Sequence, residues 1–231
     1  APDNADVLFL KGLLASVEGK GETAEQVLQQ VFEKAPNTKT MLALARQQWA
    51  IGQPESALAL QEQWVKEHPD DVVANLALSA TLVKEGQTDR ALERLKAVLE
   101  TDPKNVIALN DLAWYLKDKD PQQALDYARR AAELAPDAPQ VLDTLAMVQL
   151  AAGQVDKAGD TMARALLKSP GSPSLIYHRA LIEEKKGNLS KAVELLESAL
   201  KKSSFPEKAD AERLLPELKA QLAAQAADEQ G

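Results

Sequence analysis

The side chains that could carry chemistry are few, since the chain holds two histidines, His68 and His178, and no cysteine. A metal shell or a general acid–base site needs several such groups converging on one point, and no second histidine or cysteine supplies one here. The lack of cysteine also excludes disulfides and a thiol nucleophile. We therefore predict no catalytic residue, no metal site and no cofactor.

Two further patterns could suggest chemistry, and neither carries it. Gly19-Lys20-Gly21 lacks the glycine five places earlier and the preceding strand of a phosphate-binding loop. Carboxylate pairs such as Glu183-Glu184 are typical of a solvated helix face. The net charge of −8 and a pI of about 5.0 disfavour nucleic acid as a partner, because an acidic chain repels phosphates.

The elements that must position these residues follow a fixed period. Prolines recur at gaps of 34, 33, 34, 33 and 34 residues: Pro2, Pro36, Pro69, Pro103, Pro136 and Pro170. A period of this length is typical of a stacked repeat protein. Because the first proline already lies at the end-of-repeat position, the pattern also predicts that the chain is part of a longer array.

Small residues recur with the same period and explain how the helices pack. One set is Ala24, Ala57, Ala91, Ala124, Ala158 and Ala192, and a turn glycine stands at Gly19, Gly52, Gly86, Gly153 and Gly187. Small side chains let helix axes approach closely, and glycine permits a left-handed residue after a helix. The unit is therefore helix, turn, helix, turn. The fourth unit lacks the glycine and reads Lys117 to Pro121 instead.

This unit length resembles the tetratricopeptide repeat, in which two helices form each repeat. The resemblance implies an all-α fold, a right-handed α-superhelix (solenoid) of about six helix-turn-helix repeats. The expected repeats, within an array over 1–206, are about 5–37, 38–70, 71–104, 105–137, 138–171 and 172–206. The family's large first-helix residue is replaced mostly by Leu, Met or Ile, as at Leu8, Met41 and Ile176, with Asn75 as the polar exception.

After the sixth unit the pattern changes to Ser204-Phe205-Pro206. An amphipathic stretch follows, and we expect a capping helix over 207–226, because terminal repeats need a polar outer cover. Pro216 should kink this helix or split it in two. Residues 227–231 are expected to be a frayed tail.

A closer resemblance rests on Leu109 to Trp114, on Ala131 to Pro136 and on Val141 to Ala146. These segments resemble the C-terminal part of the tetratricopeptide lipoproteins of the exosortase/PEP-CTERM system. That resemblance implies a bacterial protein serving exopolysaccharide production and surface-protein sorting. It also implies a periplasmic or outer-membrane-associated location, with a lipid anchor on the parent protein.

In the tetratricopeptide family the first helix of each unit lines the concave face, so the resemblance assigns a partner-binding stripe. Its members are Phe9, Leu13, Leu42, Arg46, Trp49, Leu76, Asn110, Trp114, Asp143, Met147, Tyr177 and Leu181. The stripe is unusually apolar, which is typical of a groove for a peptide or helix. An equal alternative is that these residues pack between neighbouring first helices. No Lys-x-x-x-Asn occurs, so recognition of an acidic chaperone C-terminus is not expected.

These observations predict a non-catalytic scaffold that holds a protein or peptide in its concave groove. One alternative is a carbohydrate-binding scaffold, with Trp49, Trp114 and Tyr177 stacked on sugars of an exported polysaccharide. Another is an architectural spacer without a ligand.

Overall fold

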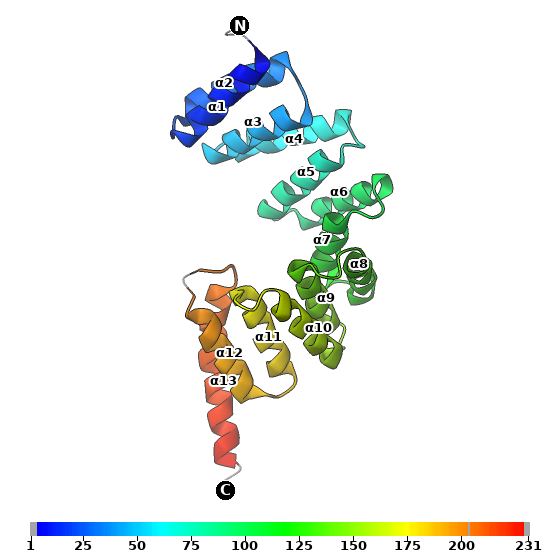
Figure 1. The fold of residues 1–231 in the computed structure, drawn as a ribbon, viewed down its shortest axis with the longest axis vertical. Coiled ribbons are helices and arrows are strands. Elements are labelled where there is room, and N and C mark those ends of the chain that lie inside the picture. Colours follow the sequence, from blue (N-terminus) through cyan, green and yellow to red (C-terminus); the bar gives the residue numbers. More distant parts are fainter. Residues whose placement is uncertain (1–3, 203, 229–231) are drawn as a thin grey trace. The chain divides into compact units, whose positions relative to one another are not determined.

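The computed structural model describes residues 4–202 and 204–228, and within these ranges it contains thirteen helices and no strand (Figure 1). The chain divides into two compact units, Ala1–Ala108 (unit 1) and Leu109–Gly231 (unit 2). The predicted all-α array of helix pairs is confirmed. Pro2, the first proline of the repeat, lies outside the described residues.

Unit 1 is a stack of helix pairs, each a first helix followed by a second. Its helices are α1 (Ala5–Val17), α2 (Gly21–Lys34), α3 (Thr38–Ala50), α4 (Pro54–Glu67), α5 (Val72–Lys84) and α6 (Thr88–Thr101). The second helices α2 and α4 each pack against their own first helix and against the first helix of the next pair, and α6 packs against α5. The first helices α1, α3 and α5 also contact one another in order, so one face of unit 1 is made by first helices.

Unit 2 repeats this arrangement. It contains most of α7 (Val106–Leu116), then α8 (Pro121–Leu134), α9 (Pro139–Ala151), α10 (Val155–Lys168), α11 (Pro173–Lys185), α12 (Leu189–Leu200) and α13 (Lys208–Asp228). The first helices α9 and α11 are in contact, and α13 packs against α12.

The turn within a pair is closed by the glycine that the repeat pattern singled out. Gly52 has a φ of +78°, a left-handed conformation that favours glycine. The N–H of Gln53 donates to the carbonyl of Gln48, and the N–H of Gly52 donates to that of Trp49. These two bonds satisfy carbonyls that the end of α3 would leave open.

In the first five pairs the second helix ends two residues before the repeat proline. His68, which follows α4, adopts φ −130° and ψ 68°, because the ring of Pro69 disfavours a helical conformation at the preceding residue. The next first helix then begins at a polar cap. Asp71 accepts a hydrogen bond from the N–H of Ala74 at 3.0 Å and so starts α5.

The small residues of the repeat lie where helices approach most closely. All six alanines of the set beginning with Ala24 are buried. Gly12 on α1 shows how little space there is, since a Cβ added to it would lie 2.8 Å from the side chain of Leu28 on α2. Large side chains at these positions would force the helices of a pair apart.

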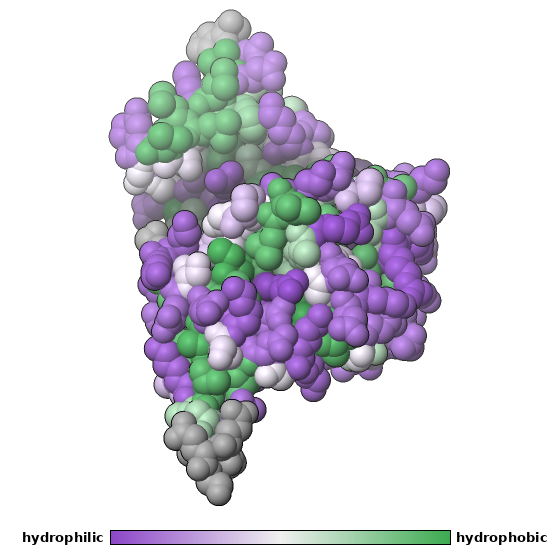
Figure 2. Space-filling view, turned by 60° about the horizontal axis from the view of Figure 1, so that its bottom comes forward, coloured by the Kyte–Doolittle hydropathy of each residue, from purple (hydrophilic) through white to green (hydrophobic). Residues whose placement is uncertain are grey.

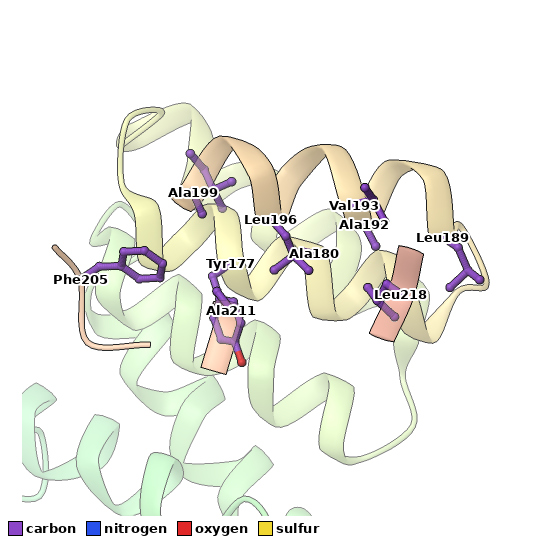
Figure 3. Close-up of a cluster of buried hydrophobic side chains, with 11 residues drawn as sticks. Tyr177, Ala180, Leu189, Ala192, Val193, Leu196, Ala199, Phe205, Ala211 and Leu218 are labelled. Carbon is purple, nitrogen blue, oxygen red and sulfur yellow. The ribbon is translucent and has the colours of Figure 1, made fainter. Parts of the chain in front are cut away.

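The helix α13 packs against α12, the second helix of the last pair. Ala211 and Leu218 of α13 are buried against Leu196 and Ala192 of α12, and Phe205 fills the end of the same cluster (Figure 3). The predicted splitting at Pro216 is wrong, because α13 continues through that residue. Pro216 is exposed, so water can satisfy the carbonyl that the proline leaves without a donor.

The predicted tail 227–231 differs in part from the structure, since α13 extends to Asp228. Its last three residues lie outside the described part of the chain.

The outer side of α1 carries a row of exposed apolar side chains. Leu10 is 65% exposed and Val17 is 87% exposed, and Val7 and Leu14 lie at helical spacing beside them. Figure 2 shows hydrophobic surface at the end of unit 1 where α1 lies. Despite such surfaces, none of the helices in the described ranges is long and apolar enough to cross a membrane.

Candidate functional site

The first-helix face of unit 1 contains a cavity of about 330 Å³ between α3, α4 and α5. Three residues of the predicted stripe, Leu42, Arg46 and Trp49, line its α3 side. The α5 side is formed by Ala77, Ala80, Thr81 and Lys84, and the α4 side by Ala57 and Gln61. The walls are thus mostly small and apolar, with a few polar groups.

A second cavity of about 390 Å³ adjoins the first and extends over α1. It shares Leu42 and Arg46 with the first cavity and adds Leu13 of the predicted stripe. We call the two adjoining cavities the unit 1 groove. Four predicted residues, Leu13, Leu42, Arg46 and Trp49, therefore lie together along it.

Phe9 and Leu76, the other predicted residues of unit 1, line neither cavity. Phe9 is 8% exposed and belongs to the core between α1 and α2, with the Nζ of Lys39 4.3 Å from its ring centre. Leu76 is half-buried on α5. For Phe9, packing between helices describes its position better than a place in a groove.

The unit 1 groove is positively charged although the protein is acidic. Arg46 and Lys84 form no ion pair with any described residue, and neither cavity is lined by an aspartate or a glutamate. The Nζ of Lys84 lies 5.3 Å from the centre of the Trp49 ring, a distance at which a cation is attracted to the face of the ring. The groove therefore presents two cations and an aromatic ring around apolar walls.

The sequence reasoning missed Gln61, which lines this groove from a second helix. Gln61 is 6% exposed, and its Oε1 is buried without a hydrogen-bond partner among the described residues. A signal for it existed in the repeat. The equivalent positions of other units hold buried apolar residues, Leu28, Leu95, Ala128, Met162 and Leu196, so a glutamine there stands out.

In unit 2 the predicted residues Trp114 and Asp143 are linked by His178. The Nδ1 of His178 lies 2.8 Å from the Oδ1 of Asp143, and the rings of Trp114 and His178 are 5.8 Å apart. His178 is 4% exposed, so the carboxylate satisfies a buried ring nitrogen. Sequence reasoning treated His178 as an isolated residue, because its partner lies on the preceding first helix.

Asn110 lies one turn before Trp114 on α7 and has an incomplete set of partners. Its amide nitrogen donates to the Oδ1 of Asp111 at 3.3 Å, while its Oδ1 is buried without a partner in the described ranges. Burial raises the pKa of Asp111, and the hydrogen bond from Asn110 only partly offsets this. Lys117 places its Nζ 4.4 Å from the centre of the Trp114 ring.

The remaining predicted residues of unit 2 are mainly core. Tyr177 is 8% exposed and points into the cluster under α13, with its ring 6.5 Å from that of Phe205 (Figure 3). Its pKa is raised, chiefly by burial. Met147 is buried on α9, and Leu181 is half-buried against the same cluster as Tyr177.

Comparison with known proteins agrees with this architecture. A family model described as the tetratricopeptide repeat matches residues 48–113 and 115–182, together more than half of the chain. The TPR repeat-containing protein PA4667 of Pseudomonas aeruginosa is 27% identical over 154 residues, which is 64% of this chain and 26% of that protein. The matched region is thus about a quarter of the length of this relative.

Two solved structures show the same fold at low identity. A tetratricopeptide repeat protein from Parabacteroides merdae ATCC 43184 has a TM-score of 0.75 at 16% identity, covering 97% of this chain and 92% of that one. YrrB, described as a TPR protein with an unusual peptide-binding site, has a TM-score of 0.58 at 21% identity, covering 75% of this chain and 91% of its own. Since the family model covers more than half of the residues and the helix pairs have the expected form, the chain belongs to the tetratricopeptide repeat family.

Proposed function

We propose that this chain is a non-catalytic scaffold whose unit 1 groove holds a segment of a protein partner. Tetratricopeptide proteins in general are scaffolds for protein–protein contacts. In this proposal residues 1–206 form the binding array and residues 207–226 cap it. The parent protein is a bacterial envelope lipoprotein that serves exopolysaccharide production and PEP-CTERM protein sorting, as the resemblance of Leu109 to Trp114 and of Val141 to Ala146 implies.

The observation that carries the proposal is the pair of free cations in the unit 1 groove. The net charge of the chain is −8, yet Arg46 and Lys84 line a groove with no aspartate or glutamate among its described lining residues. Charge of one sign in a cleft attracts a ligand of the other sign and raises its rate of association. Apolar walls beside the cations suit a peptide with both acidic and apolar side chains.

The solved relative YrrB supports a peptide as the kind of ligand, since it is described as having a peptide-binding site. An extended peptide suits the groove because it can contact α1, α3 and α5 in turn along the first-helix face. A rigid stack of helix pairs also needs little ordering when it binds, which leaves more of the contact energy for affinity.

The alternative of carbohydrate binding is less favoured by the surroundings of the aromatic side chains. Sugars stack on open ring faces, but Lys84 lies over Trp49 and Lys117 lies over Trp114. Tyr177 is buried in a cluster with Phe205 and with Ala211 and Leu218 of α13. A sugar would have to displace a lysine from each tryptophan. A peptide carboxylate would instead pair with the lysine.

Photo-crosslinking in the native host tests the proposed function. A photoreactive phenylalanine analogue replaces Ala80, which lines the groove, or Glu93, which lines a separate cavity formed by α4, α5 and α6. We expect a crosslinked protein partner from position 80 and much less from position 93. Equal yields from both positions, or none from position 80, would contradict the proposal.

A further inference from the structure

Gln61 makes the unit 1 groove selective for a ligand with a hydrogen-bond donor, which the positive charge of the groove does not. The side chain is more than nine-tenths buried, lines the cavity between α3, α4 and α5, and has an amide oxygen to which no described residue donates. A buried acceptor without a partner is unfavourable, because its bonds to water are lost and nothing replaces them. A ligand that brings a donor to this point would remove that disadvantage.

The rest of the cavity limits what can bring the donor. Ala45, Ala57, Ala77 and Ala80 leave apolar space around Gln61, and Trp49 adds an aromatic wall. The volume of about 330 Å³ is at the lower end of the range of small-molecule pockets, which is roughly 300–1,000 Å³. Such a space suits one large side chain that is apolar along its length and polar at its tip.

We propose that this cavity takes an aromatic side chain with a donor at its far edge, tyrosine or tryptophan, from an acidic segment of the partner. The ring lies among the alanines and Trp49, and its O–H or N–H donates to the Oε1 of Gln61. Carboxylates beside the aromatic residue pair with Arg46 and Lys84 at the edge of the cavity. The terminal torsion of glutamine is soft, so a rotation of the amide can meet the donor. This inference rests on the proposed function, because it names what the groove binds.

Peptides with tyrosine or phenylalanine at the same position differ only in a hydroxyl group, so they test the hydrogen-bond donor. We would measure by fluorescence polarisation the binding of labelled, end-blocked peptides of Glu and Asp with a central Tyr, Phe or Ala, and of a Lys-rich peptide with Tyr. The acidic tyrosine peptide should bind most tightly, with the phenylalanine peptide about fivefold to tenfold weaker, the effect expected of one lost hydrogen bond. The alanine and Lys-rich peptides should bind more weakly still.

The variant Gln61→Leu isolates the role of the amide. Leucine occupies the equivalent position at Leu28, Leu95 and Leu196, where it is buried, so the variant is expected to fold. It should bind the phenylalanine peptide at least as well as the tyrosine peptide. The control Gln149→Leu replaces another buried glutamine, far along the chain on α9, whose Oε1 has no hydrogen-bond partner among the described residues. It should leave the tyrosine preference unchanged.

Each outcome decides the inference. Equal binding of tyrosine and phenylalanine peptides, an unchanged preference in Gln61→Leu, or no binding of any acidic peptide would overturn it. If position 80 still crosslinks to a partner in any of these cases, the proposed function stands and only the aromatic ligand is wrong. If position 80 yields no partner, the proposed function itself fails.

Discussion

Lys84 of α5 places its Nζ 5.3 Å from the centre of the Trp49 ring on α3, so neighbouring repeats share one cation–aromatic contact. Both residues line the unit 1 groove, so the contact joins one of its cations to its aromatic ring. It also leaves the ammonium free to pair with a ligand carboxylate, since no described acidic residue pairs with it.

The variant Lys84→Gln should weaken binding of an acidic peptide about twofold to fivefold, because one partly exposed charge pair contributes up to roughly 1 kcal/mol. Its affinity should also depend less on salt, since screening acts on charge pairs. Isothermal titration at two salt concentrations checks this. The control Lys66→Gln removes a lysine that lines the separate cavity formed by α4, α5 and α6. Equal losses in both variants would argue against a role for the groove.

The contact between His178 and Asp143 predicts a loss of stability when the carboxylate is removed. Asp143→Ala leaves a buried imidazole nitrogen without its partner, so we expect a cost of about 1–3 kcal/mol in the free energy of unfolding. Urea denaturation monitored by circular dichroism measures it. Asp160→Ala on the exposed face of α10 is the control, and a similar small effect in both variants would show that the pair contributes little.

The pKa of Asp71 predicts a loss of stability in acid. Burial acts to raise this pKa, but hydrogen bonds from Thr38 at 2.5 Å and from Trp64 at 2.9 Å outweigh it, and the net shift is downward from the ordinary value of 3.8. A carboxyl whose pKa is lower in the folded state stabilises the protein above its unfolded pKa, and this contribution is lost as the pH falls through the folded pKa.

Accordingly, the urea midpoint of the parent chain should fall as the pH drops below about 4. Asp71→Asn should already be less stable at pH 7 and should lose less between pH 7 and pH 3. If both chains show the same decline in acid, other carboxyl groups are responsible for it.

Close helix packing predicts that Ala158→Leu destabilises unit 2. Ala158 is fully buried between α10 and α9, in the cluster that includes Leu142 and Ala146, and overpacking such a site costs about 1–3 kcal/mol. Thermal unfolding is the measurement. Ala163→Leu, on the exposed side of the same helix, should change the melting temperature little, and an unchanged melt for Ala158→Leu would mean that this position is not a close approach.

Much of the fold could be predicted from the sequence because each repeat feature has a local physical cause. Pro69 disfavours a helical conformation at His68, where α4 has ended, and Gly52 is needed where φ is positive. The effect of Pro216 was predicted less well, because whether a proline interrupts a helix depends on its exposure and on packing against α12. Those are properties of the tertiary structure.

The candidate site was predictable only in part. First-helix spacing placed Leu42, Arg46 and Trp49 on one face, and they line one cavity. The spacing could not show that Tyr177 is covered by Phe205, since the capping segment returns over it from a distance in the chain. It also could not show Gln61 as part of the groove, because that residue reaches it from a second helix.

The most direct test of the central claim is amide hydrogen exchange of the unaltered chain, measured with and without the partner that crosslinking identifies. The claim is that the first-helix face of unit 1 binds the partner. Backbone amides of α3 and α5 should exchange more slowly in the complex, whereas those on the outward side of α4 and α6 should keep their rates. Protection confined to α4 and α6, or the absence of any change in α3 and α5, would contradict it.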